Sequence, residues 1–227
     1  MNTYPNKKNI RAWDQLYRDS EGRIWGHTPL PFFAKWQDTL EGLELEKERI
    51  LDAGTGEGRN LPALLELSRE VHACDASQHA LNRIADSIRT QVKLKHCELS
   101  ATAYPEQHFR LVAMLDVFET LPGIRKVLNE LHRILEQEGY LFVNIPDDSD
   151  PISSTDMIPL DDGGYIYRDK YYYHFYSQEE AVNILQSSGF EVVEQRLHTW
   201  IEAPHENYRS DSHTHTSSVF LLKKTPI

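Results

Sequence analysis

The sequence of 227 residues predicts an α/β fold: a doubly wound, seven-stranded, mostly parallel sheet with an antiparallel edge hairpin. Three observations lead to this prediction. Apolar strand-like runs alternate with amphipathic helical segments from residue 48 onward. A glycine-rich turn follows the first of these strands and opens a helix. Two final strands have no helix between them, which favours antiparallel pairing at the sheet edge.

The parallel strands are expected in five apolar segments, 49–53, 70–76, 91–99, 109–117 and 140–146. The helices are expected in the four segments with helical apolar spacing, 60–69, 77–90, 124–135 and 177–190. Ser77 is suited to cap the second helix. The edge hairpin is expected to pair 191–200 with 216–224.

Two segments lie outside the alternation. Residues 1–47 are expected to form an N-terminal helical lid on the compact unit 48–227. The aromatic and histidine side chains of this segment either cover a ligand or simply pack on the core; they are Trp13, Tyr17, Trp25 and His27. Residues 146–176 form a long connection, of the length that often binds ligands.

The composition excludes several classes of partner. The net charge of −11 disfavours nucleic acid and anionic membrane surfaces, because both would repel the chain. No apolar run approaches the length of a membrane span, and the N-terminus lacks the apolar stretch of a signal peptide. Cys74 and Cys97 have no CxxC neighbour and are expected to be reduced thiols in a cytoplasmic protein. The oligomeric state is left open.

The glycine-rich turn reads "ILDAGTGEGRN" over residues 50–60. Its spacing is D-x-G-x-G-x-G, not the G-x-G-x-x-G of dinucleotide sites. Asp52 and Glu57 would repel a pyrophosphate, which needs backbone N–H groups and no nearby negative charge. They suit a ligand with a cationic centre, and S-adenosylmethionine carries a sulfonium and an ammonium. Glycine would let its amino-acid part approach the backbone closely.

Acidic residues also follow the next strands on the same rim. Asp75 can accept hydrogen bonds from both ribose hydroxyls. Glu98 can reach the adenine amino group together with the backbone of Leu99, and Asp116 would border the reacting methyl group.

These residues resemble the class I S-adenosylmethionine-dependent methyltransferases, in particular the small-molecule branch. The stretches that carry the resemblance appear in the family's order; they are "ILDAGTGEGRN", "ACDAS", "FRLVAMLDVFETLP", "VLNELHRILEQEGYLFVNIP" and "YHFYSQEEAVNILQSSGFEVVE". The resemblance implies the Rossmann-like methyltransferase fold, with S-adenosylmethionine as cofactor and S-adenosylhomocysteine as product. The cofactor site is expected at Asp52, Gly54, Thr55, Gly56, Gly58, Asp75, Ala76, Glu98, Leu99 and Asp116.

Some positions depart from the family pattern. Many relatives have Cys at Thr55 and Asp at Glu98. Many have Glu-His after the fourth strand, where this sequence has Glu119-Thr120, so a histidine base is absent there. The stretch "WDQLYRDSEGRIWGHTPLP" also resembles the lid of tellurite and thiol methyltransferases.

The acceptor is expected between the lid and two further segments. "YIYRDKYYYHFY" (165–176) alternates like a hairpin, and either forms a substrate wall, with Tyr173 or His174 positioning the nucleophile, or fills its own small core. The segment 198–218 is rich in histidine, and His213 and His215 would share one face if extended. Three interpretations stay open for this segment: a metal site, a substrate site with His205, Tyr208 and Arg209, or a solvated loop. No metal site is assigned.

The function expected is methyl transfer to a small-molecule acceptor by in-line displacement, for which the protein supplies alignment and desolvation. A hydroxyl or amine acceptor needs a base, and the candidates are His174, His205, His213 and Asp116. A thiolate or metalloid anion needs none. The alternatives are a methyltransferase fold that binds without transfer, and a protein methyltransferase; an NAD or nucleotide-sugar enzyme is disfavoured by the turn.

Overall fold

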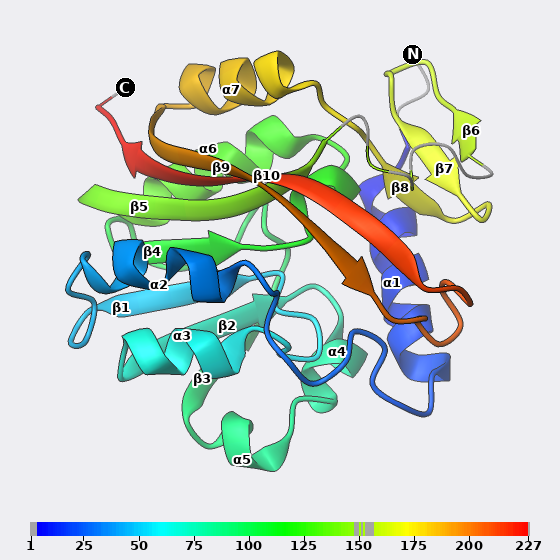
Figure 1. The fold of residues 1–227 in the computed structure, drawn as a ribbon, viewed down its shortest axis with the longest axis horizontal. Helices are drawn as coiled ribbons and strands as arrows, with labels where there is room; N and C mark the ends of the chain where they lie inside the picture. The colour runs from blue at the N-terminus through cyan, green and yellow to red at the C-terminus, as the bar shows by residue number, and fades with distance from the viewer. Residues whose placement is uncertain (1–3, 148–149, 151, 153–156, 227) are drawn as a thin grey trace.

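One seven-stranded sheet organises the chain, and it confirms the expected fold class (Figure 1). The computed structural model describes residues 4–147, 150, 152 and 157–226. All pairs among the first five strands are parallel, and β10 is antiparallel to both neighbours. In the order in which they pair, the strands are β3 (Val92–His96), β2 (Glu70–Asp75), β1 (Arg49–Ala53), β4 (Phe109–Met114), β5 (Leu135–Pro146), β10 (His213–Lys224) and β9 (Phe190–Glu202).

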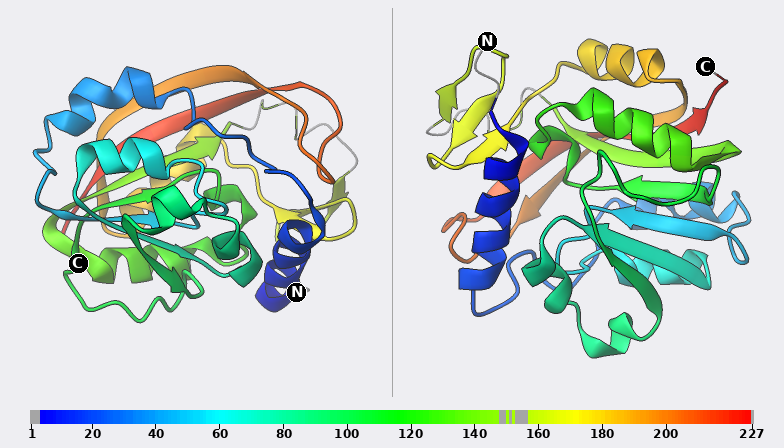
Figure 2. Two further views of the ribbon diagram at one scale, coloured as in Figure 1. Left: turned by 90° about the horizontal axis from the view of Figure 1, so that it is seen from below. Right: turned by 180° about the vertical axis from the view of Figure 1, so that it is seen from behind.

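Helices cover both faces of the sheet, which is why the central strands are apolar on both sides. Alternate residues of β4 enter two different cores: Leu111 packs with α2 and α3, whereas Val112 packs with α6 and α7. Figure 2 shows these helices as separate layers. The helices of the two faces are α2 (Phe33–Glu41), α3 (Leu61–Leu67) and α4 (Gln78–Asn82) on one side, and α6 (Ile124–Ile134) and α7 (Gln178–Ser187) on the other.

The single helix expected over 77–90 is wrong, because the structure has α4 and a separate short α5 (Asp86–Arg89). Ser77 does cap α4, accepting the N–H of Ala80. The break begins at Arg83, whose guanidinium donates to the carbonyl of Ser20 at 2.8 Å and pairs with Glu57 at 3.2 Å. These tertiary contacts outweigh the helical periodicity of the segment.

Several strand boundaries also differ from expectation. Strand β4 ends at Met114, before Asp116, and β3 ends at His96, before Glu98, so both acidic residues lie in the following turns. The histidine-rich segment 198–218 is not mainly a loop, since β9 runs to Glu202 and β10 begins at His213. Long antiparallel pairing between the two strands explains the extension.

A small second sheet lies beyond the end of the main one. The hairpin expected at 165–176 is present as β7 (Tyr165–Tyr167) and β8 (Tyr171–Tyr173), and β6 (Met157–Pro159) adds an unexpected third strand. The first helix, α1 (Asn6–Asp19), contacts both β8 and α4. Figures 1 and 2 show α1 crossing the end of the main sheet beside this small sheet.

The tip of the β9–β10 hairpin reaches the chain that follows α1. The carboxylate of Glu206 accepts the N–H of Gly22 at 2.8 Å, and the Nδ1 atom of His205 lies 2.8 Å from the carbonyl oxygen of Ile24. Three segments far apart in sequence, α1, β6–β8 and this hairpin tip, thereby surround the carboxyl ends of the parallel strands.

Candidate active site

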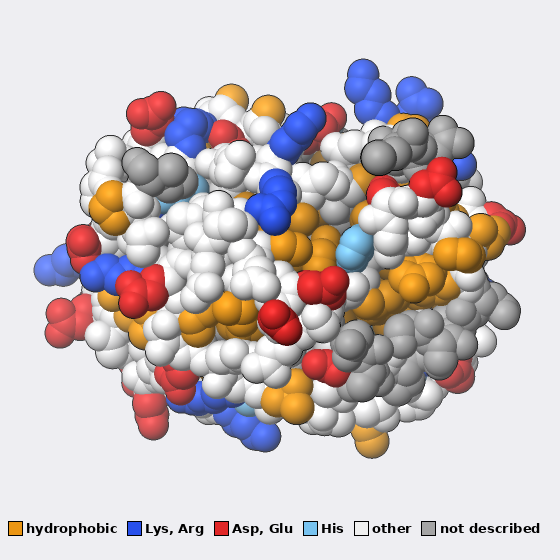
Figure 3. All heavy atoms as spheres, turned by 90° about the horizontal axis from the view of Figure 1, so that it is seen from above, with side chains coloured by type: hydrophobic (Ala, Val, Ile, Leu, Met, Phe, Trp, Pro, Cys, Tyr) orange, Lys and Arg blue, Asp and Glu red, His pale blue; other side chains and the backbone are white. Residues whose placement is uncertain are grey.

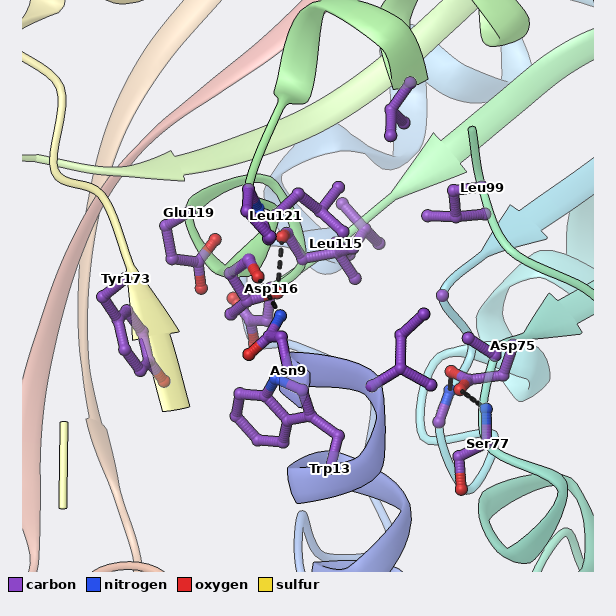
Figure 4. Close-up of a pocket in the computed structure, with 18 of the residues that line it drawn as sticks. Asn9, Trp13, Asp75, Ser77, Leu99, Leu115, Asp116, Glu119, Leu121 and Tyr173 are labelled. Carbon is purple, nitrogen blue, oxygen red and sulfur yellow. Dashed lines mark hydrogen bonds between the residues drawn. The ribbon is translucent and has the colours of Figure 1, made fainter. Parts of the chain in front are cut away.

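A cavity of about 550 Å³ lies at the carboxyl ends of β1, β2 and β4, under α1. This is the place where doubly wound sheets bind ligands. Figure 4 shows Asp75 and Ser77 at one end of the cavity and Glu119 and Tyr173 at the other, with Trp13 of α1 between them.

The glycine-rich turn forms the floor of one end. Gly54 and Gly56 both have left-handed φ angles, +80° and +55°. A Cβ atom on Gly54 would lie 2.7 Å from the Val117 side chain, and one on Gly56 would lie 2.6 Å from the Tyr17 hydroxyl. The turn therefore needs glycine for its backbone angles and for the close approach of its neighbours.

Asp75 closes the turn from the neighbouring strand. Its Oδ2 atom accepts the N–H of Gly56 and its Oδ1 atom accepts the N–H of Ser77, each at 2.8 Å. Burial raises the pKa of this carboxyl. Asp75 thus lies at the tip of β2, held by two backbone groups and lining the cavity.

The two carboxylates within the glycine-rich turn, those of Asp52 and Glu57, do not line the cavity. Asp52 is 2% exposed and accepts the hydroxyl of Thr55 at 2.6 Å. Glu57 is fully buried, accepts the N–H of Trp25 at 2.8 Å and pairs with Arg83. Through its hydrogen bond with Trp25, Glu57 ties the N-terminal segment to the turn.

The turn after β4 is held by a buried amide. Asn144 of β5 is fully buried; its Oδ1 accepts the N–H of Asp116 and its Nδ2 donates to the Asp116 carboxylate, both at 2.7 Å. Asp116 itself has a left-handed φ of 54°. The amide therefore fixes a strained residue that lines the cavity.

Replacing Asn144 with alanine should lower the free energy of unfolding by about 2–3 kcal/mol, because the buried amide makes two part-buried hydrogen bonds that are lost and the Asp116 groups lose this partner. Urea denaturation checks this. The exposed Asn82→Ala is the matched control and should stay within about 0.5 kcal/mol of the parent. Equal effects of the two substitutions would contradict the role given to Asn144.

Glu119 lies at the opposite end of the cavity. It lies in the short 3-10 helix Phe118–Thr120, is 5% exposed and lines the cavity. Its Oε2 atom is buried and has no hydrogen-bond partner among the residues that the structure describes. Burial, reinforced by the charges of Asp116 and Asp150, raises the pKa of its carboxyl well above the usual value.

The residue that anchors α1 against this end is Asn9. Its Nδ2 donates to the carbonyl of Thr120 at 2.7 Å, and its Oδ1 accepts the N–H of Tyr172 at 3.1 Å. Trp13, one turn further along α1, has its ring 4.6 Å from that of Tyr171 and 5.7 Å from that of Tyr208. The hydroxyls of Tyr173 and Tyr208 are hydrogen-bonded to each other.

The β9–β10 hairpin adds a histidine cluster to the wall. The rings of His213 and His215 lie 4.7 Å apart, and that of His205 lies 5.0 Å from His213. Burial disfavours charge on His215, but its hydrogen bond to Asp150 and the negative charges of Asp116, Asp150 and Glu202 together outweigh burial and raise its pKa. No group of three or more His, Cys, Asp or Glu side chains in the described part of the chain is arranged to hold a metal ion.

Most of the residues expected in the site do line this cavity. They are Trp13, Tyr17, Trp25, Gly54, Thr55, Gly56, Asp75, Ala76, Glu98, Leu99, Asp116, Tyr173, His205, Tyr208, His213 and His215. Five do not, namely Asp52, Gly58, His27, His174 and Arg209.

Three of these five lie as follows. Gly58 faces Leu61 and Ile84, on the helix side of the turn. His27 is exposed. The His174 ring stacks on Tyr176 with centroids 4.2 Å apart, and only its backbone contacts the site, donating to the Glu119 carbonyl.

Asn9 and Glu119 are among the cavity residues that the sequence analysis missed. Asn9 lies on the buried face of α1, where a polar side chain in an apolar stripe could have indicated a role. Glu119 was noted only for lacking a following histidine. Its burial results from α1 and β8, which are far away in sequence.

The buried carboxyl of Asp52 makes stability depend on pH. Burial raises its pKa from 3.8 to about 7, so between these values the folded protein holds a proton that the unfolded chain releases. The free energy of unfolding should therefore fall as pH rises through this window. Asp52→Asn should gain roughly 1–3 kcal/mol over the parent at pH near 7, and the gain should vanish near pH 4. Urea denaturation at several pH values checks this; a gain that does not change with pH would contradict it.

Comparison with known proteins identifies the family. The model of the family described as "Methyltransferase domain" matches residues 25–195. A curated relative, the tRNA 5-carboxymethoxyuridine methyltransferase of Escherichia coli K12, is 28% identical over 142 residues, which cover 58% of this chain and 54% of that protein. The chain thus spans about half the length of the curated relatives it matches.

Solved structures share the fold. An S-adenosylmethionine-dependent methyltransferase from Methanosarcina mazei superposes with a TM-score of 0.66 at 17% identity, over 88% of this chain and all of that one. A structure titled "Conversion of a Disulfide Bond into a Thioacetal Group during Echinomycin Biosynthesis" has a TM-score of 0.71 at 16% identity, over 95% of this chain and 93% of that one. The chain therefore belongs to the family described as "Methyltransferase domain".

Proposed function

We propose that the chain transfers the methyl group to a small molecule that enters the Glu119 end of the cavity, while S-adenosylmethionine occupies the Asp75 end. The observation that carries this proposal is the cavity itself. It is continuous between the two ends, and α1, the small sheet and the hairpin tip contribute to its wall.

The Asp75 end fits the cofactor. Asp75 would accept the ribose hydroxyls, and the turn 54–56 would let the amino-acid part approach the backbone. Glu98 and Leu99 would border the adenine. The volume of about 550 Å³ lies within the range typical of small-ligand sites, roughly 300–1,000 Å³.

S-adenosylmethionine supplies a methyl group activated by a sulfonium. The residues of this chain align the acceptor and exclude water, which are the main protein contributions to such a displacement. The segment 1–47 acts as the lid, because Trp13, Tyr17 and Trp25 line the cavity from above the strand ends. Its links to the Glu57 turn and to the hairpin tip would hold the closed arrangement.

Charge also supports a small acceptor over a polynucleotide. The net charge is −11. On the face shown in Figure 3, basic side chains are interspersed with acidic ones, and the described side chains of that face form no continuous basic surface. The curated relative that acts on tRNA makes nucleic acid the second candidate. No helix in the described residues is long and apolar enough to span a membrane.

Incubation with S-adenosylmethionine labelled in the methyl group tests this proposal. The purified chain is offered fractionated small-molecule extract and, separately, bulk tRNA and protein. Label in the small-molecule fraction, dependent on the enzyme, is expected. Label in tRNA or protein alone would overturn the small-molecule acceptor and leave the methyltransferase activity standing.

A further inference from the structure

We propose that the acceptor is an amine, bound as its ammonium form against Glu119 and the aromatic rings around it, and that Glu119 takes the amine's proton. This inference rests on the proposed function, since it names the class of molecule that the Glu119 end receives. It is carried by a buried carboxylate oxygen that has no hydrogen-bond partner among the described residues, by an aromatic wall and by the charge balance of the cavity.

Glu119 has the geometry of a ligand-binding carboxylate. Only 5% of the residue is exposed, and its Oε2 atom has no partner among the described residues. A buried carboxylate oxygen left unpaired is costly, so such a group is usually paired or has a role with a ligand. Figure 4 shows its carboxylate on the cavity side of its turn, beside Tyr173 and Asp116.

Aromatic rings surround the same end. Trp13, Tyr173 and Tyr208 line the cavity there and come from α1, β8 and the hairpin loop. Faces of aromatic rings attract ammonium groups, by up to about 2 kcal/mol or more when the site is desolvated. Rings and a buried carboxylate together favour a cation with an apolar body.

The charges that line the cavity also favour a cationic acceptor. The described lining residues include two side chains with a permanent positive charge, Arg59 and Lys126. Arg59 is neutralised by Glu202 at 2.7 Å, and Lys126 is exposed. Carboxylates outnumber them even without Glu202, which pairs with Arg59; the others are Asp75, Glu98, Asp116, Glu119 and Asp162. A carboxylate or phosphate acceptor would meet repulsion at Glu119, whereas an ammonium would be attracted.

The proton transfer follows from the same arrangement. The ammonium enters opposite the Glu119 carboxylate and gives it one proton, which leaves a neutral amine. The nitrogen lone pair then forms a bond to the methyl carbon as the carbon–sulfur bond breaks and its electron pair stays on sulfur. The products are the methylated ammonium and a neutral thioether, and Glu119 releases its proton to solvent.

Other titratable groups face Glu119 and would shape its pH dependence. The acidic groups are Asp116, in the same turn, and Asp150. The phenol groups are those of Tyr173, Tyr176 and Tyr208. Burial and these acidic groups favour the protonated form of Glu119 in the empty site, and the ammonium group of the bound amine offsets them by stabilising the carboxylate.

Binding of matched probes tests the inference without turnover. Phenethylamine, phenethyl alcohol, phenethyl thiol and hydrocinnamate share one aryl body and differ in the head group; ethylamine and ethanol repeat the comparison without the ring. Each is titrated by calorimetry into the protein saturated with S-adenosylhomocysteine. At least one amine should bind about tenfold or more tightly than its alcohol, and hydrocinnamate should bind most weakly.

The variant Glu119→Gln keeps the shape and removes the charge. It should weaken amine binding by about 10- to 100-fold, leave alcohol and S-adenosylhomocysteine binding within about twofold, and lower kcat/KM for the amine by about 10²–10⁴-fold. The acidic limb of the pH profile should disappear. Glu179→Gln, on the exposed first turn of α7, is the control and should change none of these.

The outcomes separate the two proposals. Absence of S-adenosylhomocysteine binding to the parent protein would overturn the proposed function. Normal S-adenosylhomocysteine binding with no preference for either amine would overturn the amine assignment alone. So would methylation of the thiol or hydrocinnamate in preference to the amine, or an unchanged amine affinity in folded Glu119→Gln.

Discussion

Replacing Asp75 with alanine should weaken S-adenosylmethionine binding by roughly 1.5–3 kcal/mol, or about 10- to 150-fold. The physical reason is the loss of the carboxylate proposed to accept the ribose hydroxyls. The same carboxylate holds the N–H groups of Gly56 and Ser77 at 2.8 Å, so its removal also loosens the turn.

Calorimetric titration of the variant with S-adenosylmethionine measures this effect. Asp38→Ala on the exposed face of α2 is the matched control and should bind like the parent. An Asp75→Ala protein that is folded by circular dichroism and binds with parent affinity would remove Asp75 from the cofactor site.

Gly54→Ala should cost roughly 2–5 kcal/mol of stability and at least tenfold in cofactor affinity. The new Cβ would lie 2.7 Å from Val117, and the backbone φ is +80°. Left-handed backbone costs a non-glycine residue about 1–2 kcal/mol, and overpacking adds about 1–3 kcal/mol. Because Val117 also lines the cavity, its displacement would reach the site.

Gly26→Ala separates the cost of the left-handed backbone from the cost of the steric clash. Gly26 has the same left-handed conformation, with φ +81°, but no atom lies within 4 Å of its added Cβ. It should lose only the backbone contribution, about 1–2 kcal/mol, and keep its cofactor affinity. Equal losses in the two variants, measured by urea denaturation and calorimetry, would contradict the steric argument at Gly54.

The sheet was predictable because its signals are local. The strand of 49–53, the D-x-G-x-G-x-G turn and the alternation of later segments each depend on a few neighbouring residues. The helix over 77–90 failed because Arg83 bonds with Glu57 and with carbonyls of the N-terminal segment, which no local pattern reports.

In the candidate site too, some residues were predictable from local sequence signals and others were not. Asp75 and Gly54 could be named because strand ends and glycine spacing predict their positions. Glu119 could not be assigned a role, because its burial depends on Asn9 of α1, Tyr173 of β8 and Tyr208 of the hairpin loop meeting around it. His174 was expected in the site because it lies in the aromatic segment 165–176. Its ring stacks on Tyr176 instead and does not line the cavity.

Calorimetric titration of the purified chain with S-adenosylmethionine, S-adenosylhomocysteine and NADH tests whether the cavity is an adenosyl-cofactor site. Both adenosyl compounds should bind with micromolar affinity at one site per chain, and NADH should give no heat. Binding of NADH with similar affinity, or no binding of either adenosyl compound by the folded protein, would contradict that assignment.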